Sequence, residues 1–564
     1  MSSRPRHERA VVRGPALVLD TLRANAVSAA VWVVAGSAAN VAMAIALKRE
    51  MDSYPGGAGA LAASILPAAE AMRPLRWPAE RLDTLGGYLT YHNLTLFALF
   101  LTLYGAMQGA KAIRGGEDDH SLEEVLATGW SRWDVVRDRA LGFVATIAII
   151  ALGLGLGTAA GLAAAREPDL SGALGAFAAI GSCALLGYGL GLFVSQLTTD
   201  RRAAAGISAV VLTCLYVVEN TWEDLHGLGI LRFVSPFHYV NLSRALVPGH
   251  GFNPLTAAVL VTAAAVLVLA SGWAFQRRDY RAPLWHRTRP VTTAGAGAIS
   301  TAGSAGGALP RVLLRSAWSA LVVRGRYGLL AWSGAAALFT GLMMFLEPAV
   351  MDVWSWFATF IPGGGGLTGT SAETQYIGFA TQIVIPFVAG YVITQGSGWA
   401  ADLAQGRVEL VVATRLSASR LVADRLLSVV LGTAVVALGA ILGLCVGAVA
   451  VDVALEVPGL VRTGAVSVLL GAALAGVAAL VVAVFRGPRA VTVLAVLLGA
   501  SCLVGYLVEL FSWPSWTARF SVFALFGSPY LDWPGATDSL VLAGLAVVGG
   551  VAAMRVSETL PKVA

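Results

Sequence analysis

Lysine is almost missing from this chain of 564 residues, because only Lys48, Lys111 and Lys562 occur among its 39 basic residues. A phosphate-binding loop of the P-loop type needs Gly-x4-Gly-Lys followed at once by Ser or Thr. The three lysines are followed by Arg, Ala and Val. The sequence therefore excludes nucleotide binding through such a loop, and we expect no ATP hydrolysis by this chain itself.

Cysteine and histidine are also scarce. The four cysteines lie in apolar segments without a Cys-x-x-Cys pair, and the seven histidines do not recur at the spacing of metal ligands. The polar residues form no Ser-His-Asp set and no carboxylate pair in a polar setting, and the basic residues do not gather into a patch for nucleic acid. We expect no catalytic residue, no metal site, no cofactor bound by this chain and no nucleic-acid partner.

Charge is the third scarcity. Only 13% of the residues are charged and 57% are hydrophobic, which is typical of a polytopic membrane protein. Apolar segments long enough to cross the hydrocarbon core, which takes about 20 residues, predict an all-α fold with twelve transmembrane helices. We place them near residues 26–47, 88–110, 140–165, 171–197, 204–220 and 254–275, and again near 327–347, 377–400, 426–451, 459–485, 489–510 and 538–555.

An internal repeat divides these twelve segments into six and six. A shift of 286 positions aligns residues 123–161 with 409–447 without a gap, and 17 of the 39 pairs are identical. The identities include Glu123 with Glu409, the Asp-Arg pair at 138–139, and three glycines. Shared composition would not align a charged segment and three glycines at one offset, so we infer an internal duplication.

Each repeat joins a polar helix to an apolar one. From Glu117 to Arg139 apolar residues recur every three or four positions, which predicts one amphipathic helix on the membrane surface. The next 26 residues lack charge and predict a membrane span. Small residues let helices pack closely in lipid, and we therefore expect helix packing at Gly153, Gly157, Gly161, Gly439, Gly443 and Gly447.

Arginine placement predicts the orientation, since cytoplasmic loops carry an excess of positive charge. It puts both termini and both amphipathic helices on the cytoplasmic side of the cell (inner or plasma) membrane. We expect a cytoplasmic amphipathic segment at 1–25, a first six-helix half at 26–278, a flexible linker at 279–308, rich in Thr, Ala, Gly and Ser, and a second half at 309–564. The aromatic segments before the sixth and twelfth spans predict re-entrant helices at the outer surface, and a role for Glu219 and Glu509 there is left open.

The motif Glu-x-x-Leu-Ala-Thr-x-x-Ser-Arg between the second and third spans, with Ser-Pro-Phe before the sixth, resembles the ABC-2 type exporter permeases. The double-length form is similar to the actinobacterial permeases assigned to polyketide antibiotic exporters such as the tetronasin type, which act in multidrug efflux and antibiotic resistance. The resemblance implies two copies of a separate ABC ATPase subunit, which bind ATP and Mg. It also implies that the amphipathic helices couple to them through Glu123, Glu124, Arg132, Arg137, Glu409, Arg415 and Arg420.

The same resemblance places a substrate pathway on the second and fifth spans of each half. Aromatic residues with little charge there suit a hydrophobic or amphipathic small molecule, such as a drug, a polyketide or a lipid-like compound moved outward through the surrounding membrane lipid. The candidates are Phe97, Phe100, Tyr104, Tyr216, Phe379, Phe387, Tyr391 and Tyr506. The alternative interpretation of these aromatics is that they only fill helix interfaces.

Two other functions compete with the permease. A proton-coupled secondary transporter with twelve helices needs a carboxylate or histidine deep in the membrane, and the predicted spans hold acidic residues only near their ends. A membrane scaffold would not need two equivalent amphipathic docking helices. The sequence therefore favours an exporter permease that is not itself an enzyme.

Overall fold

A computed structural model describes residues 16–73, 76–118, 120–199, 201–221, 229–284, 317–351, 371–404, 417–485, 487–510 and 514–558. Within these ranges every regular element is a helix, and eleven helices are long and apolar enough to cross a membrane. The all-α polytopic fold is therefore confirmed. A shorter apolar stretch, Arg489–Gly505, lies where the eleventh span is expected, and the total of twelve stays a prediction.

The chain forms two compact units. Unit 1 comprises residues 1–62 and 73–288, and unit 2 comprises 63–72 and 289–564. The division at 288 falls inside the predicted linker 279–308, most of which lies outside the described residues.

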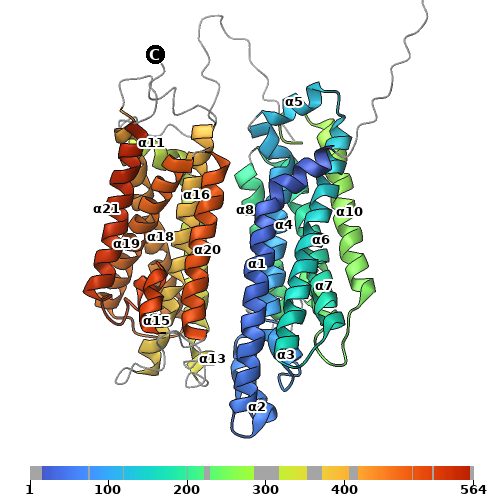
Figure 1. The fold of residues 1–564 in the computed structure, drawn as a ribbon, viewed down its shortest axis with the longest axis vertical. Helices are drawn as coiled ribbons and strands as arrows, with labels where there is room; N and C mark the ends of the chain where they lie inside the picture. Colours follow the sequence, from blue (N-terminus) through green and yellow to red (C-terminus); the bar gives the residue numbers. More distant parts are fainter. Residues whose placement is uncertain are drawn as a thin grey trace, which may run out of the picture. The chain divides into compact units, whose positions relative to one another are not determined.

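Unit 1 is a bundle of long helices (Figure 1) in which α1 packs along α6, and α7 packs between α4 and α10. The short α5 lies at one end of this bundle. The elements from the start of the chain are α1 (Ala16–Ser53), α2 (Gly57–Ala71), whose residues from 63 onward fall in unit 2, α3 (Leu85–Leu89), the π-helix η2 (Thr90–Leu94), α4 (Thr95–Asp118), α5 (Ser121–Ala127), α6 (Arg132–Ala164), α7 (Leu170–Leu197), α8 (Arg201–Thr221), the 3-10 helix η3 (Gly229–Val234), α9 (Pro236–Asn241) and α10 (Pro254–Arg277).

Unit 2 repeats this packing, with α12 along α18 and α19 along α21. Its elements are α11 (Ala317–Arg324), α12 (Arg326–Phe345), α13 (Glu347–Met351), α15 (Ala372–Gln382), α16 (Val384–Ala404), α18 (Ala418–Ala450), α19 (Val457–Phe485), α20 (Pro488–Leu510), the 3-10 helices η7 (Ser515–Phe520) and η8 (Ala524–Phe526), and α21 (Ala536–Glu558).

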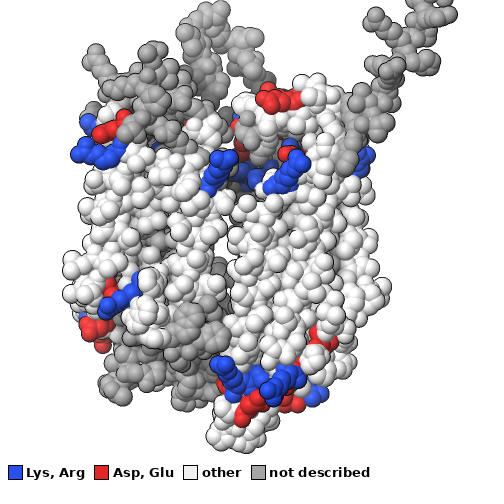
Figure 2. Space-filling view, in the orientation of Figure 1, with Lys and Arg blue, Asp and Glu red and all other residues white. Residues whose placement is uncertain are grey.

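On the face drawn in Figure 2, charged side chains lie toward the two ends of the helices of each unit. A white band without charge lies between these two groups. Apolar side chains at the middle of the long helices remain exposed, for example Leu152 at 55% and Leu438 at 55%. A helix surface of this kind is stable in a bilayer, where lipid tails cover the apolar side chains.

The repeated serine sets where each repeat's long helix begins. Ser131 caps α6, because its Oγ accepts a hydrogen bond from the Asp134 backbone N–H at 3.0 Å and the Asp134 carboxylate accepts one from the Ser131 N–H. At the aligned position Ser417 caps α18, accepting from the Arg420 N–H at 3.3 Å. Such caps satisfy backbone donors that a helix start leaves unpaired.

The structure differs from the predicted single helix over Glu117–Arg139. α4 ends at Asp118, α5 is a separate short helix, and Arg132–Arg139 forms the first two turns of α6. Gly129 has φ +86°, which a helix cannot accommodate, and the cap at Ser131 starts the chain again in a new direction. At the N-terminus, α1 is continuous from Ala16, so the described part of the predicted segment 1–25 belongs to the same helix as the first span.

Candidate functional site

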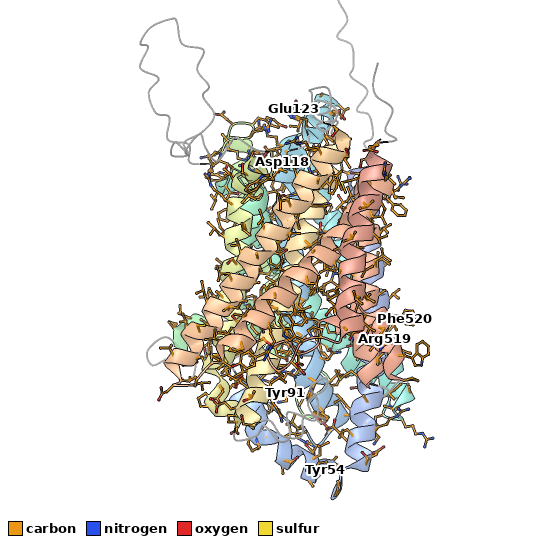
Figure 3. All side chains as sticks on the ribbon, turned by 90° about the vertical axis from the view of Figure 1, so that its left-hand side faces the viewer. Tyr54, Tyr91, Asp118, Glu123, Arg519 and Phe520 are labelled. Atoms are coloured by element: carbon orange, nitrogen blue, oxygen red, sulfur yellow. The ribbon has the colours of Figure 1, made fainter. Side chains whose placement is uncertain are left out.

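Two carboxylates stand exposed on α5 at one end of unit 1. Leu122 is fully buried and anchors this helix, whereas Glu123 and Glu124 face outward. His120 Nδ1 lies 3.3 Å from Glu123 Oε1, and this hydrogen bond holds the pKa of the Glu123 carboxyl below its usual range. Figure 3 shows Glu123 and Asp118 at this end, with Tyr54 and Tyr91 toward the opposite end.

Arg132 and Arg137 lie on the first turns of α6, and they differ in exposure and in hydrogen-bond partners. Arg137 is exposed, and its Nε donates to the Asp138 carboxylate at 2.8 Å. Arg132 is half-buried and donates to the backbone carbonyls of Phe275 and Arg278, both at 2.8 Å. Arg132 therefore ties the start of α6 to the end of α10, while Glu123, Glu124 and Arg137 remain on the surface.

A buried ionic network lies beside α5 and joins three helix ends. The Glu117 carboxylate accepts from Arg114 Nη1 at 2.8 Å and from Arg278 Nη2 at 2.7 Å, and the three side chains are 1%, 1% and 0% exposed. Arg114 also donates to the Ser195 carbonyl at 2.8 Å, and Arg278 Nε donates to Gln196 Oε1 at 2.8 Å. The ends of α4, α7 and α10 are thus held together by one set of charge-assisted hydrogen bonds.

Such a network fixes geometry more than it adds stability. Burying charges costs free energy, which the pair recovers only with good geometry and further hydrogen bonds. Both guanidiniums meet that condition, since each also donates to the Ala282 carbonyl, at 3.0 Å from Arg114 and 3.1 Å from Arg278. The link from the end of α4, against which α5 packs, therefore extends to the ends of α7 and α10.

Unit 2 has an ion pair near the corresponding helix start. Arg425, the repeat partner of Arg139, donates to the Asp402 carboxylate at 2.6 Å and lies over the Trp399 ring at 5.5 Å. Arg420 is exposed on the first turn of α18. Glu409 and Arg415 lie outside the described residues, so the second copy of the predicted coupling set stays a prediction.

The aromatic pathway candidates of unit 1 are mostly packed among its own helices. The Tyr104 hydroxyl is 2.8 Å from the Ser28 hydroxyl, and the Trp32 ring contacts the rings of Phe97 and Tyr104 at centroid distances of 6.2 and 6.0 Å. Tyr216, 3% exposed, packs edge-on against a ring of α9. Phe100 differs because it is 52% exposed, so it is the candidate in unit 1 most accessible to a substrate or a lipid.

In unit 2 the candidates are likewise packed. Phe387 contacts the rings of Trp332 and Phe339 at 6.4 and 5.5 Å, and Phe379 contacts Tyr376 at 6.4 Å. Tyr391 is 4% exposed. The side chain of Tyr506 lies outside the described residues. These contacts favour the interface-filling interpretation for most of the aromatics, and the pathway stays a prediction.

The repeated glycines face the first long helix of their own unit. A Cβ on Gly157 would lie 2.2 Å from Ser37 Oγ of α1, and one on Gly443 would lie 1.9 Å from a carbonyl oxygen of α12. At the other four repeated glycines an added Cβ would lie between 2.2 and 2.9 Å from the nearest atom of these helices, namely at Gly153, Gly161, Gly439 and Gly447. The backbones of α1 and α6, and of α12 and α18, approach too closely for a side chain to fit between them.

Glu219, whose role the sequence left open, belongs to a second polar cluster near the end of α8. Its Oε1 accepts from Asn241 at 3.2 Å and lies 3.2 Å from His238 Nδ1. Arg244 donates to Asn241 Oδ1 at 2.7 Å and pairs with Glu80 at 2.9 Å. This cluster ties α8 and α9 to the segment before α3.

Sequence reasoning missed the buried network. Arg114 and Glu117 stand at the polar end of an apolar segment, and Arg278 reads as one of several basic residues that set topology. The available signal was the spacing of three between Arg114 and Glu117, which puts both on one helix face. No sequence signal brings Arg278, 161 residues away, to the same carboxylate.

Comparisons with known families cover both units. Residues 19–280 match the family model described as ABC-2 family transporter protein. Residues 314–556 match the model described as multidrug efflux system permease Rv1217c, C-terminal domain. A comparison with curated protein sequences found no match.

Proposed function

The chain belongs to the ABC-2 family of transporter permeases and is the transmembrane permease subunit of an ABC exporter; from this premise we propose that α5 docks a separate ATPase subunit. Permeases of this family generally work with ABC ATPase subunits. The repeat at 409–425 supplies a second docking segment on the same chain, so one permease binds two ATPase subunits, which bind ATP and Mg.

The observation that supports docking at α5 is the combination of exposed charge with rigid anchoring. Glu123 and Glu124 are free of the core, while Leu122 holds the helix against the end of α4, where the buried network begins. A surface that only rests against lipid headgroups does not need this linkage. A partner that moves during ATP hydrolysis does, because the motion must reach the membrane helices.

The arginines at the α5 end of unit 1 indicate how the protein is oriented in the membrane. Arg114, Arg132, Arg137, Arg139 and Arg278 all lie there, around α5. The excess of positive charge favours the cytoplasm for this end, where ATP is available. In this proposal the distribution of arginine along the sequence also puts both termini in the cytoplasm, and export runs toward the end of unit 1 that carries the Glu219 cluster.

The transported molecule is hydrophobic or amphipathic in this proposal. Exposed aromatic and aliphatic side chains such as Phe100 offer apolar contact, and a charged solute would need compensating groups in the middle of the spans. Polyketides, drugs and lipid-like compounds fit this chemistry.

The test reverses the charge of the docking helices. Glu123→Lys combined with Glu409→Lys should abolish substrate-stimulated ATP hydrolysis in the reconstituted complex and weaken ATPase binding, while the melting temperature of the permease stays within a few degrees. Glu70→Lys, an exposed carboxylate on α2, is the matched control and should keep full activity. Retention of stimulated hydrolysis in the double variant would remove α5 as the docking site.

Mass measurement of the intact complex tests the stoichiometry. One permease with two ATPase subunits is expected, because each half of the chain carries its own docking segment. A complex with two permease chains would contradict the proposed arrangement.

A further inference from the structure

A small cavity in unit 1 lies between α5 and the ends of α1, α4, α6, α7 and α8. Its volume is about 170 Å³. Since a water molecule takes about 30 Å³ in the liquid, the space holds several waters or one compact polar group. It is separate from the exposed carboxylates of α5 and from the buried Glu117 network.

The lining of this cavity is rich in positive charge. Lys111 comes from α4, Arg139 from α6 and Arg201 from α8, whereas Asp20 of α1 is the one carboxylate in the lining. Gln108 adds an amide. Asp20 offsets one of the three positive charges, so the charged residues in the lining leave a net positive charge, which attracts an anion.

Tyr188 provides an independent sign of a ligand. Its side chain is 4% exposed and lines the cavity, yet its hydroxyl is buried without a hydrogen-bond partner among the described residues. The Phe143 ring stacks on it at a centroid distance of 4.3 Å and 12° between the planes, which fixes the direction of the hydroxyl. Buried hydroxyls are nearly always paired, so an unpaired one at a cavity wall indicates an acceptor that enters the cavity.

We propose that this cavity binds the phosphate group of an anionic phospholipid. A tetrahedral phosphate presents oxygens in several directions and can meet donors from Lys111, Arg139 and Tyr188 at once, which a planar carboxylate cannot do as well. Exposed apolar side chains lie on the neighbouring turns, with Met107 of α4 at 57% and Ile207 of α8 at 47%, and these suit acyl chains. Basic pockets between transmembrane helices are a recognised form of lipid headgroup site.

Binding here would hold α1, α4, α6 and α8 together next to α5. The lipid would therefore stabilise one arrangement of the helices that receive the motion of the docking helix. The inference depends on the membrane location of the chain and not on ATPase docking, so binding can be measured on the permease alone.

The experiment uses the full-length permease, purified in detergent and stripped of lipid. Its melting temperature is measured with added phosphatidylglycerol, with phosphatidylcholine, and with inorganic phosphate at equal ionic strength. Phosphatidylglycerol should raise the melting temperature by several degrees, clearly more than the other two. An equal shift with inorganic phosphate would retain the phosphate site and overturn its assignment to lipid, and no shift with either anion would overturn the site.

Variants separate binding from folding. Tyr188→Phe keeps the ring stacking and removes only the unpaired hydroxyl, so without lipid it should melt at the same or a higher temperature than the wild type. With phosphatidylglycerol its shift should fall by at least half, as should that of Lys111→Gln. Arg277→Gln, an exposed arginine at the same end, is the control and should keep the full shift.

Native mass spectrometry gives the second measurement. The wild type and the Arg277→Gln control should retain one more tightly bound phosphatidylglycerol than Tyr188→Phe and Lys111→Gln. Equal lipid numbers and equal shifts in all four proteins would show that the cavity is only hydrated, and the proposal would be wrong.

Discussion

Replacement of Glu117 by glutamine removes the single anion from the buried network at the α5 end of unit 1. Glutamine has nearly the same size as glutamate, so the substitution opens no cavity. Arg114 and Arg278, both at most 1% exposed at the side chain, would then share a neutral amide in place of a carboxylate. Both buried guanidiniums would lose the one carboxylate that they share among the described residues.

The loss in the free energy of unfolding caused by Glu117→Gln can be compared with the loss caused by breaking a solvent-exposed ion pair. Removal of one partner from a buried ion pair costs about 3–5 kcal/mol, which raises the unfolding equilibrium constant by roughly two to four powers of ten. Glu167→Gln is the control, because this carboxylate is 43% exposed and lies 3.0 Å from Lys48 Nζ. Solvent screens such a pair, and its loss should cost less than about 1 kcal/mol.

The measurement is a denaturant titration of each purified permease in detergent, together with ATP hydrolysis in the reconstituted complex. Glu117→Gln should unfold at much lower denaturant and should couple poorly, because the end of α10 loses its charged link through Arg278 to α4. The double variant Glu117→Gln, Arg278→Gln should lose less stability than the two single variants together, by about 0.5–3 kcal/mol. A loss for Glu117→Gln no larger than that for Glu167→Gln would refute the description of this network as the rigid link.

Three further predictions concern other parts of the molecule. Gly443→Ala should destabilise the permease by about 1–3 kcal/mol in the same titration, whereas Gly499→Ala, whose Cβ would meet nothing within 4 Å, should not; equal effects would contradict close helix packing. Phe100→Ala should change which hydrophobic compounds stimulate ATP hydrolysis, with little loss of melting temperature. Tyr391→Ala should mainly lower the melting temperature. An unchanged stimulation profile for Phe100→Ala would remove Phe100 from the pathway. Burial raises the pKa of the Glu347 carboxyl, so the wild type loses stability as the pH rises above the unfolded-state pKa of about 4.3. Glu347→Gln should therefore have a higher melting temperature than the wild type at pH 7 and lose that advantage near pH 4. An equal difference in melting temperature at both pH values would argue against the raised pKa.

Much of the fold was predictable because it depends on local composition. A run of apolar residues without charge must be helical to cross a bilayer, since every backbone group has to be paired within the segment. The repeat at 286 residues also shows in the structure, where Ser131 and Ser417 cap equivalent helices. The family resemblance, carried by the motif around Glu123, is confirmed by the two family models.

The break between α5 and α6 shows where periodicity alone misleads. The apolar spacing of Glu117–Arg139 suits one helix, but Gly129 and the cap at Ser131 interrupt it. Those two signals are local and could have been weighed against the periodicity. The spacing persists across the break because apolar residues on both sides of it are buried, such as Leu122 of α5 and Val136 of α6.

The sequence by itself determined where the long apolar helices lie, that they come in two related sets, and to which family of transporters the chain belongs. Only the tertiary structure decided that Glu117 meets Arg278, that Arg132 bonds the end of α10, and that Tyr188 lines a basic cavity. The physical reason is that helix formation and membrane insertion depend on neighbours along the chain. The partner of a buried charge depends on how helices distant in sequence pack together, and no residue pattern records that.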